Sequence, residues 1–382
     1  MMNRLFTYAL WAGLLLTTST CSISEPLPQY RDIAFAERPK NIILMVGDGM
    51  GLAQISGALY TNRNRLNLEY FPVIGFHKSY SYDDLITDSA AGATAFACGV
   101  KTYNSAIGMT HDTLPCPSIL EEAERRGMAT GLVATATLVH ATPAAFFAHQ
   151  PMRVLYEDIA ADLLDIEVDL LIGGGQKYFN RRDKDNRDLT ADLRRADYDV
   201  YNYMEHNIHE VPLHPERNLL YFTADKHPVP VAGGRNYLSY AARLSPLFLE
   251  QHSDKGFFLV IEGSQIDWMC HSNDAQSAIK ETLDFDRAIG EILDYARQSK
   301  NTLVIVTADH ETGGMALNPG SKMGRINGAF TTNGHTAALI PVFAYGPGAE
   351  LFSGIYENTA IHTKMRQALG LDQSSPLQES DR

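Results

Sequence analysis

Asn41-Ile42-Ile43-Leu44-Met45-Val46 is the stretch of this sequence that decides the fold. A continuous apolar run of this length is typical of a strand that is buried on both faces of a parallel sheet. The run ends in Gly47-Asp48-Gly49-Met50-Gly51. Ligands of open α/β sheets gather at the carboxyl ends of strands, so Asp48 stands where chemistry usually takes place. Taken alone, the pattern fits a turn aspartate between glycines equally well.

Comparable apolar runs alternate with helical patterns along the rest of the chain. Further strands are expected over 71–82, 130–136, 168–172, 256–261, 302–307 and 337–344. Helices are expected over 118–126, 155–164, 237–251, 275–299 and 359–369. This alternation predicts an α/β fold with a mainly parallel central sheet sandwiched between helices.

The periodicity weakens between about residues 180 and 235, where charged residues, Tyr, His and Pro become frequent. We interpret this segment as a surface excursion of a single catalytic domain that extends over residues 25–382. The segment contains histidines without a tight ligand pattern, which we interpret as solvated surface residues. They are His206, His209, His214 and His227.

Composition limits the classes of function. With 382 residues, 45% of them hydrophobic, the chain is long enough to bury a large core. A formal net charge of −13 excludes general affinity for nucleic acid or anionic membranes. A phosphate-sized anion can still bind where metal ions and an arginine face it.

The first 24 residues have the features of a secretory signal peptide. Arg4 supplies the charge, and the apolar run from Leu5 to Leu16 is too short to span a bilayer. Cleavage near residue 24 predicts a periplasmic or secreted protein without stable membrane insertion. Cys21 faintly resembles a lipoprotein site, although Thr20 before it argues against lipidation. Cleavage would leave Cys98, Cys116 and Cys270, which allow at most one internal disulfide.

Thr87-Asp88-Ser89-Ala90-Ala91-Gly92-Ala93-Thr94-Ala95 places a hydroxyl beside a carboxylate at the start of an alanine-rich helix. Asp88 can cap this helix, and the helix N-terminus favours anions. Ser89 is therefore a candidate nucleophile for an anionic substrate. Arg153 is a candidate for a two-pronged contact with phosphate oxygens. Taken alone, the stretch 87–95 also fits an ordinary helix start, and Arg153 also fits a residue in a surface ion pair.

Several predicted strands lead to a carboxylate, imidazole or hydroxyl group. These side chains belong to Asp48, Thr142, Glu262, Asp309 and His310. Asp267 and His271 are four residues apart and share one face of a helical turn, which is a usual arrangement for zinc ligands. His335 adds an imidazole in the tight loop Gly334-His335-Thr336. Oxygen and nitrogen ligands without thiolates favour zinc in mixed sites and magnesium where only oxygens gather.

Five stretches of the sequence resemble, in order, the motifs of alkaline phosphatases. They are 46–51, 87–95, 262–271, 307–314 and 334–336, within a resemblance that extends from about residue 40 to about residue 369. The resemblance implies that Asp267, His271 and His335 hold one zinc ion and that Asp48, Asp309 and His310 hold a second. It also implies one magnesium ion on Asp48, Thr142 and Glu262.

The same resemblance implies an activity, hydrolysis of small phosphate monoesters by a homodimer. Ser89, activated by the second zinc ion, would form a phosphoserine, Arg153 would bind the phosphate oxygens, and Asp88 would position both. His140 and Trp268 depart from the pattern, because the best studied bacterial member has Asp and Lys there. Since a histidine beside the third ion favours zinc, that ion could be zinc instead of magnesium.

Two other functions remain open from the residues. Related superfamily members cleave phosphodiesters, commonly with a threonine nucleophile, so Ser89 together with Arg153 favours monoesters. A non-catalytic exported phosphate or zinc binding protein would need no nucleophile, and Ser89 beside the ligand set argues against it.

Overall fold

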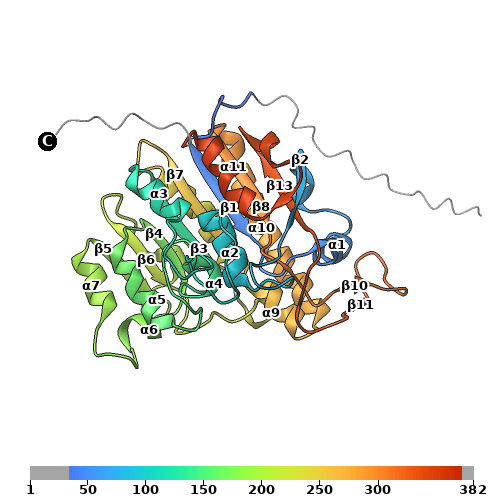
Figure 1. Cartoon of the computed structure of the whole chain (residues 1–382), viewed down its shortest axis with the longest axis horizontal. Helices are drawn as coiled ribbons and strands as arrows, with labels where there is room; N and C mark the ends of the chain where they lie inside the picture. The colour runs from blue at the N-terminus through green and yellow to red at the C-terminus, as the bar shows by residue number, and fades with distance from the viewer. Residues whose placement is uncertain (1–33, 372–382) are drawn as a thin grey trace, which may run out of the picture. The chain divides into compact units, whose positions relative to one another are not determined.

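A ten-stranded sheet forms the centre of the computed structural model, which describes residues 34–371 (Figure 1). The expected signal peptide and Cys21 lie outside the described residues. The strand order is β14-β2-β13-β8-β1-β7-β3-β4-β6-β5. Within this sheet only β13 runs against the other strands, since it pairs antiparallel with both β8 and β2. The prediction of a mainly parallel sheet in an α/β fold is thus confirmed.

The strands of this sheet are short and mostly buried. Their bounds are β1 (Asn41–Val46), β2 (Val73–Lys78), β3 (Ala129–Thr137), β4 (Leu170–Gly174), β5 (Tyr198–Asn202), β6 (Asn218–Phe222), β7 (Phe257–Glu262), β8 (Thr302–Thr307), β13 (Ile340–Tyr345) and β14 (Gly354–Glu357). Two small antiparallel pairs lie outside it, β9 (Glu311–Thr312) with β12 (His335–Thr336) and β10 (Ala316–Leu317) with β11 (Gly328–Ala329).

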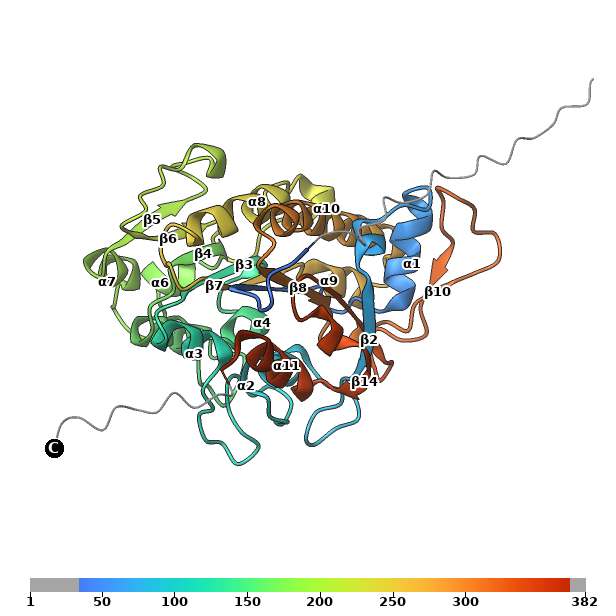
Figure 2. The ribbon, with the colours of Figure 1, turned by 90° about the horizontal axis from the view of Figure 1, so that it is seen from above.

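Helices cover both faces of the sheet, as Figure 2 shows with α8 and α10 on one side and α2, α3 and α11 on the other. The helix bounds are α1 (Leu52–Thr61), α2 (Ser89–Cys98), α3 (Ile119–Arg125), α4 (Ala141–Ala144), α5 (Tyr156–Asp162), α6 (Lys177–Asn180), α7 (Leu189–Arg195), α8 (Leu238–Leu249), α9 (Gln265–His271), α10 (Ala275–Ser299) and α11 (Thr359–Leu369).

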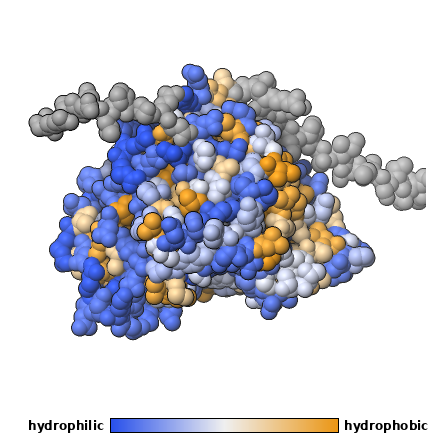
Figure 3. Space-filling view, in the orientation of Figure 1, coloured by the Kyte–Doolittle hydropathy of each residue, from blue (hydrophilic) through white to orange (hydrophobic). Residues whose placement is uncertain are grey.

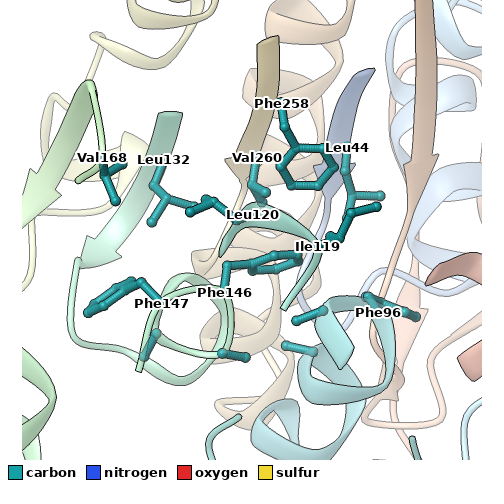
Figure 4. Close-up of a cluster of buried hydrophobic side chains, with 14 of the residues drawn as sticks. Leu44, Phe96, Ile119, Leu120, Leu132, Phe146, Phe147, Val168, Phe258 and Val260 are labelled. Carbon is teal, nitrogen blue, oxygen red and sulfur yellow. The ribbon is translucent and has the colours of Figure 1, made fainter. Parts of the chain in front are cut away.

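The largest cluster of buried apolar side chains joins the sheet to α2, α3 and α4 (Figure 4). Phe146 packs on Phe258 of β7 with ring centroids 6.1 Å apart. Leu44 of β1 and Val260 of β7 line the same cluster. Each such buried side chain contributes about 1.5–3 kcal/mol, so this layer holds the N-terminus of α2 firmly against the sheet.

Residues 180–235 are more regular than the expected surface excursion. They contribute β6, buried along its length, and β5, which together form one edge of the central sheet. Their apolar pattern is weak because β5 is an edge strand with half-buried residues and because polar turns interrupt the segment.

The surface in Figure 3 is mostly hydrophilic, with separate apolar groups. Within residues 34–371, no helix combines the length and the apolar character that crossing a bilayer requires.

Candidate metal centre and active site

Four neighbouring strands deliver the candidate ligands to one edge of the sheet. In the order β8-β1-β7-β3, their carboxyl ends lead to Asp309 and His310, to Asp48, to Glu262, and to His140 with Thr142 on α4. Val46 pairs with Thr307 on one side and with Glu262 on the other, so the strands end level with each other. Residues more than 200 positions apart in the sequence therefore meet in space.

Three groups of these side chains are close enough to hold a metal ion. The first contains Asp48, Asp309 and His310, the set that the family resemblance implies for one zinc ion. Nε2 of His310 lies 3.3 Å from Oδ2 of Asp309 and 3.5 Å from Oδ1 of Asp48. All three side chains are fully buried.

The second group surrounds Asp267, which α9 presents beside β12. Asp267, His310 and His335 form a cluster of metal-site size, and the ring of His335 stacks on that of His310 at 3.6 Å between centroids. The predicted ligand His271 adjoins them, with Nε2 3.3 Å from Oδ2 of Asp267 and 3.1 Å from Nε2 of His335. The hydrogen bond to Asp267 raises the pKa of His271 to about 9.

The third group contains Asp48, His140 and Glu262. The predicted ligand Thr142 lies two residues after His140, on α4, with its hydroxyl buried. His140 was expected beside this site. In the structure its ring is one of the three groups that form the cluster, in a position where it could bind the ion directly. Burial, followed by the charge of Arg153, lowers the pKa of His140 well below its ordinary value, so its imidazole is neutral and able to bind a cation.

The buried oxygens of these groups fit cations. Both carboxylate oxygens of Asp48 and of Glu262, Oδ2 of Asp309 and the hydroxyl of Thr142 lack a hydrogen-bond partner. Burial raises the pKa of Glu262 to about 8. Burial and the Asp267 carboxylate raise that of Asp309 to about 6. Since buried acceptors are normally paired, this set fits metal ions that replace the missing partners.

Ser89 stands beside the first group at the N-terminus of α2. Its Oγ lies 3.2 Å from Nε2 of His310. Asp88 caps α2, with Oδ1 accepting a hydrogen bond from the backbone N–H of Ala91, as predicted. Gly92 allows the helix to approach, because a Cβ there would come within 3.1 Å of Asp309 Cβ. The small residues of this helix thus bring Ser89 next to the metal ligands.

Arg153 reaches the same place from the loop before α5. Its Nη1 donates to Oδ2 of Asp88 at 3.0 Å, and Nη2 lies 3.4 Å from Nε2 of His140. The backbone of Ser105 fixes the positions of Asp88 and Arg153, since its N–H donates to Oδ2 of Asp88 and its carbonyl accepts from the N–H of Arg153. This arrangement leaves a guanidinium at a fixed position near Ser89.

Two residues near the ligands were missed by sequence reasoning. Thr312 of β9 donates its hydroxyl hydrogen to Oδ1 of Asp267 at 2.5 Å, and its oxygen lies 3.2 Å from Nδ1 of His310. A hydroxyl has one hydrogen, so His310 donates from Nδ1 and keeps the lone pair of Nε2 directed at Ser89 and Asp48. The register of β9 with β12, which pairs Thr312 with His335, creates this contact.

The other missed residue is His227, which was interpreted as a solvated surface histidine. It is exposed, but its ring packs edge-on against Trp268 of α9 at 4.7 Å and against His140 at 5.8 Å between centroids. Trp268 also packs on His140 at 5.7 Å. The three rings form an aromatic wall beside the third group, which no local sequence pattern indicates.

Comparison with known proteins agrees with this geometry. The sequence profile of the family described as "Alkaline phosphatase" matches residues 39–233, 242–327 and 321–371. The chain belongs to the alkaline phosphatase family. Members of this family are phosphomonoesterases, and the resemblance seen in the sequence is confirmed.

Individual alkaline phosphatases align over most of their length. "Alkaline phosphatase 3" of Bacillus subtilis (strain 168) is 30% identical over 91% of this chain and 93% of its own length. "Alkaline phosphatase" of Escherichia coli (strain K12) is 30% identical over 89% and 88%. The solved alkaline phosphatase of the Antarctic bacterium TAB5 superposes with a TM-score of 0.81, is 42% identical, and covers 88% of this chain and 99% of its own. A variant of the TAB5 enzyme with a histidine replaced by glutamate is described with magnesium bound in its M3 site.

Proposed function

We propose that this protein is an exported alkaline phosphatase that hydrolyses phosphate monoesters through a phosphoserine on Ser89. The observation that carries the proposal is the position of Ser89 Oγ, 3.2 Å from His310 Nε2 and at the N-terminus of α2. The unpaired carboxylate oxygens of Asp48 and Asp309 belong to the same cluster as His310, and Arg153 pairs with Asp88, the residue before Ser89. A nucleophile, an anion-binding arginine and cation ligands are thus brought together by a few direct contacts.

In this proposal, Ser89 Oγ gives up its proton and attacks phosphorus, the bond from phosphorus to the ester oxygen breaks, and the departing oxygen takes up a proton and leaves as the alcohol. Water then attacks the phosphoserine from the vacated side, which releases phosphate and restores the Ser89 hydroxyl. Arg153 binds the non-bridging oxygens of the phosphate, and Asp88 keeps the guanidinium oriented. The first free N–H groups of α2 add positive potential at the same oxygens.

The cation assignment is part of the proposal. Zinc would bind to Asp267, His271 and His335 and to Asp48, Asp309 and His310. Magnesium would bind to Asp48, Thr142 and Glu262, unless His140 makes this third ion zinc. Bound cations would lower the pKa of the Ser89 hydroxyl and neutralise charge on the phosphate and on the departing oxygen.

The test is hydrolysis of a chromogenic phosphomonoester and of the matching diester between about pH 7 and about pH 10. We expect Ser89→Ala to reduce monoester turnover by at least about a thousandfold, and chelation to abolish it reversibly. Ser245→Ala, which removes a buried serine hydroxyl from α8, is the matched control. Wild-type turnover in Ser89→Ala contradicts the mechanism, and faster cleavage of the diester favours the phosphodiesterase alternative.

Export and assembly are further parts of the proposal. The predicted signal peptide supports export, which cell fractionation tests. Exposed apolar side chains support a homodimer, and they include Tyr82, Leu85, Leu114 and Val154. Sedimentation at several concentrations distinguishes a dimer from a monomer.

A further inference from the structure

Two of the three cysteines in the described part of the chain meet at the C-terminal end of α2. Cys98 is the last residue of this helix, and its Sγ lies 3.0 Å from the carbonyl oxygen of Cys116. Both side chains are buried in the main apolar cluster. Hydrogen bonding with the side chain of Cys116, together with burial, raises the pKa of the Cys98 thiol.

The third cysteine has a different environment. Cys270 lies on α9, where its sulfur accepts a hydrogen bond from Gln54 Nε2 at 3.6 Å. Metal binding does not account for Cys98 and Cys116, since no metal-sized cluster found among residues 34–371 includes either of them. The structure therefore selects one pair out of the three that the sequence allows.

Loop 99–115, which separates Cys98 from Cys116, forms hydrogen bonds with two residues of the active site, Asp88 and Arg153. Asn104 Oδ1 accepts the N–H of Asp88 at 2.8 Å, and the N–H of Ser105 donates to Oδ2 of Asp88 at 3.0 Å. The carbonyl of Ser105 accepts the N–H of Arg153 at 2.8 Å. Any constraint on the ends of this loop thus limits the motion of Asp88 and Arg153.

We propose that Cys98 and Cys116 form a disulfide in the mature protein, which closes loop 99–115 and keeps Asp88 and Arg153 in position. The inference rests on the export included in the proposed function, because disulfides persist in oxidising compartments. The two thiols lose two protons and two electrons as the S–S bond forms. A thiol–disulfide oxidoreductase accepts the electrons, and its own disulfide becomes a dithiol. Since both sulfurs are buried, this exchange precedes the final packing of α2.

Thiol counting on the chain from residue 25 onward tests the disulfide directly. Protein exported into an oxidising compartment, and protein refolded with a glutathione redox buffer, are denatured in acid and titrated before and after reduction. We expect one free thiol, that of Cys270, before reduction and three after it, with peptide mapping that joins the Cys98 and Cys116 peptides. Three free thiols in the refolded protein, or a bond to Cys270, overturn the proposal.

The refolded sample separates this inference from the proposed function. Its thiol count does not depend on export, and its turnover of a chromogenic phosphomonoester is measured in parallel. An inactive protein with the Cys98–Cys116 bond contradicts the proposed function only. An active protein with three thiols contradicts the disulfide only.

Variants test the effect on the loop. With zinc in excess, a phosphine reductant should lower the midpoint of thermal inactivation of wild type and of the control Cys270→Ala by about 3 to 6 °C. Cys98→Ala and Cys116→Ala, which lack the bond, should not respond to the reductant. Equal responses of Cys98→Ala and wild type contradict the closure of loop 99–115 by this bond.

Discussion

Replacing Thr312 by valine should weaken metal binding without changing any ligand. Valine keeps the shape of threonine but lacks the hydroxyl that donates to Oδ1 of Asp267 at 2.5 Å and contacts Nδ1 of His310 at 3.2 Å. Asp267 then loses a partner that orients its carboxylate, and His310 loses the acceptor that fixes its tautomer. Asp267 belongs to the second metal group and His310 to both the first and the second, so the two groups are affected together.

The magnitude follows from the hydrogen bond that is lost. A hydrogen bond to a charged group contributes about 1.5–3 kcal/mol. At about 1.4 kcal/mol for each factor of ten, this corresponds to roughly a 10- to 150-fold loss of affinity. That range agrees with the 10- to 100-fold loss that is typical when a residue supporting a ligand is removed.

The assay is competition for zinc between the loaded protein and a chromogenic chelator, followed by turnover of a phosphomonoester at saturating zinc. Thr312→Val should give up zinc at a lower chelator concentration and regain most of its turnover when zinc is added. Thr282→Val removes a buried hydroxyl from α10 that bonds only the carbonyl of Ala278, and it should retain zinc like wild type. A folded Thr312→Val protein with wild-type zinc affinity would refute the reasoning.

Three further predictions concern the third ion, a buried ion pair and pH dependence. His140→Asp should strengthen activation by magnesium, because a carboxylate, which suits magnesium, replaces an imidazole, which suits zinc, beside Asp48 and Glu262. Identical magnesium titrations of mutant and parent argue against it. Arg235→Met should lower the free energy of unfolding in urea by about 3–5 kcal/mol, because it leaves Glu281 buried without its cation and Asp284 with an exposed partner alone, Arg287. Arg287→Met, which removes that exposed partner, should cost less than about 1 kcal/mol. Hydrogen bonding to Glu121 raises the pKa of His149 from 6.5 to about 9, so its stabilisation is complete below pH 6.5 and disappears as the pH rises through about 9. His149→Gln should remove this part of the pH dependence of unfolding, and an unchanged profile would show that the pair contributes nothing.

Two strands at the centre of the sheet, β1 and β8, could be predicted to the residue, and β3, β4 and β7 to within one or two residues at each end. β1 and β8 coincide with the apolar runs 41–46 and 302–307, because strands buried on both faces need apolar side chains at every position. At the sheet edges this requirement disappears, and β5 and β14 were not predicted. β6 is buried along its length, but it was missed as well because it is short and lies in a segment rich in polar turns. Strand order was also beyond prediction, since it depends on pairing between residues far apart in the sequence.

The same distinction applies to the candidate site. Asp48, Glu262 and Asp309 each stand at the end of a recognisable apolar strand, so each could be predicted as a site residue from its own stretch of sequence. Thr312 and His227 contribute through contacts with other segments, and their sequence surroundings carry no pattern of their own. His140 was expected near the third group, but only the fold shows that its ring and the Asp48 carboxylate face one point.

The charge of the site explains why its candidate ligands could be predicted from the sequence. Asp48, Glu262, Asp267 and Asp309 are buried together, and the nearest guanidinium, Arg153, is already paired with Asp88. Uncompensated carboxylates cost several kcal/mol each when they are buried. A chain that needed only stability would replace them with apolar residues of similar volume. Their presence at the ends of three adjacent strands and on α9 is therefore explained by bound cations, and the cations in turn contribute to holding these segments together.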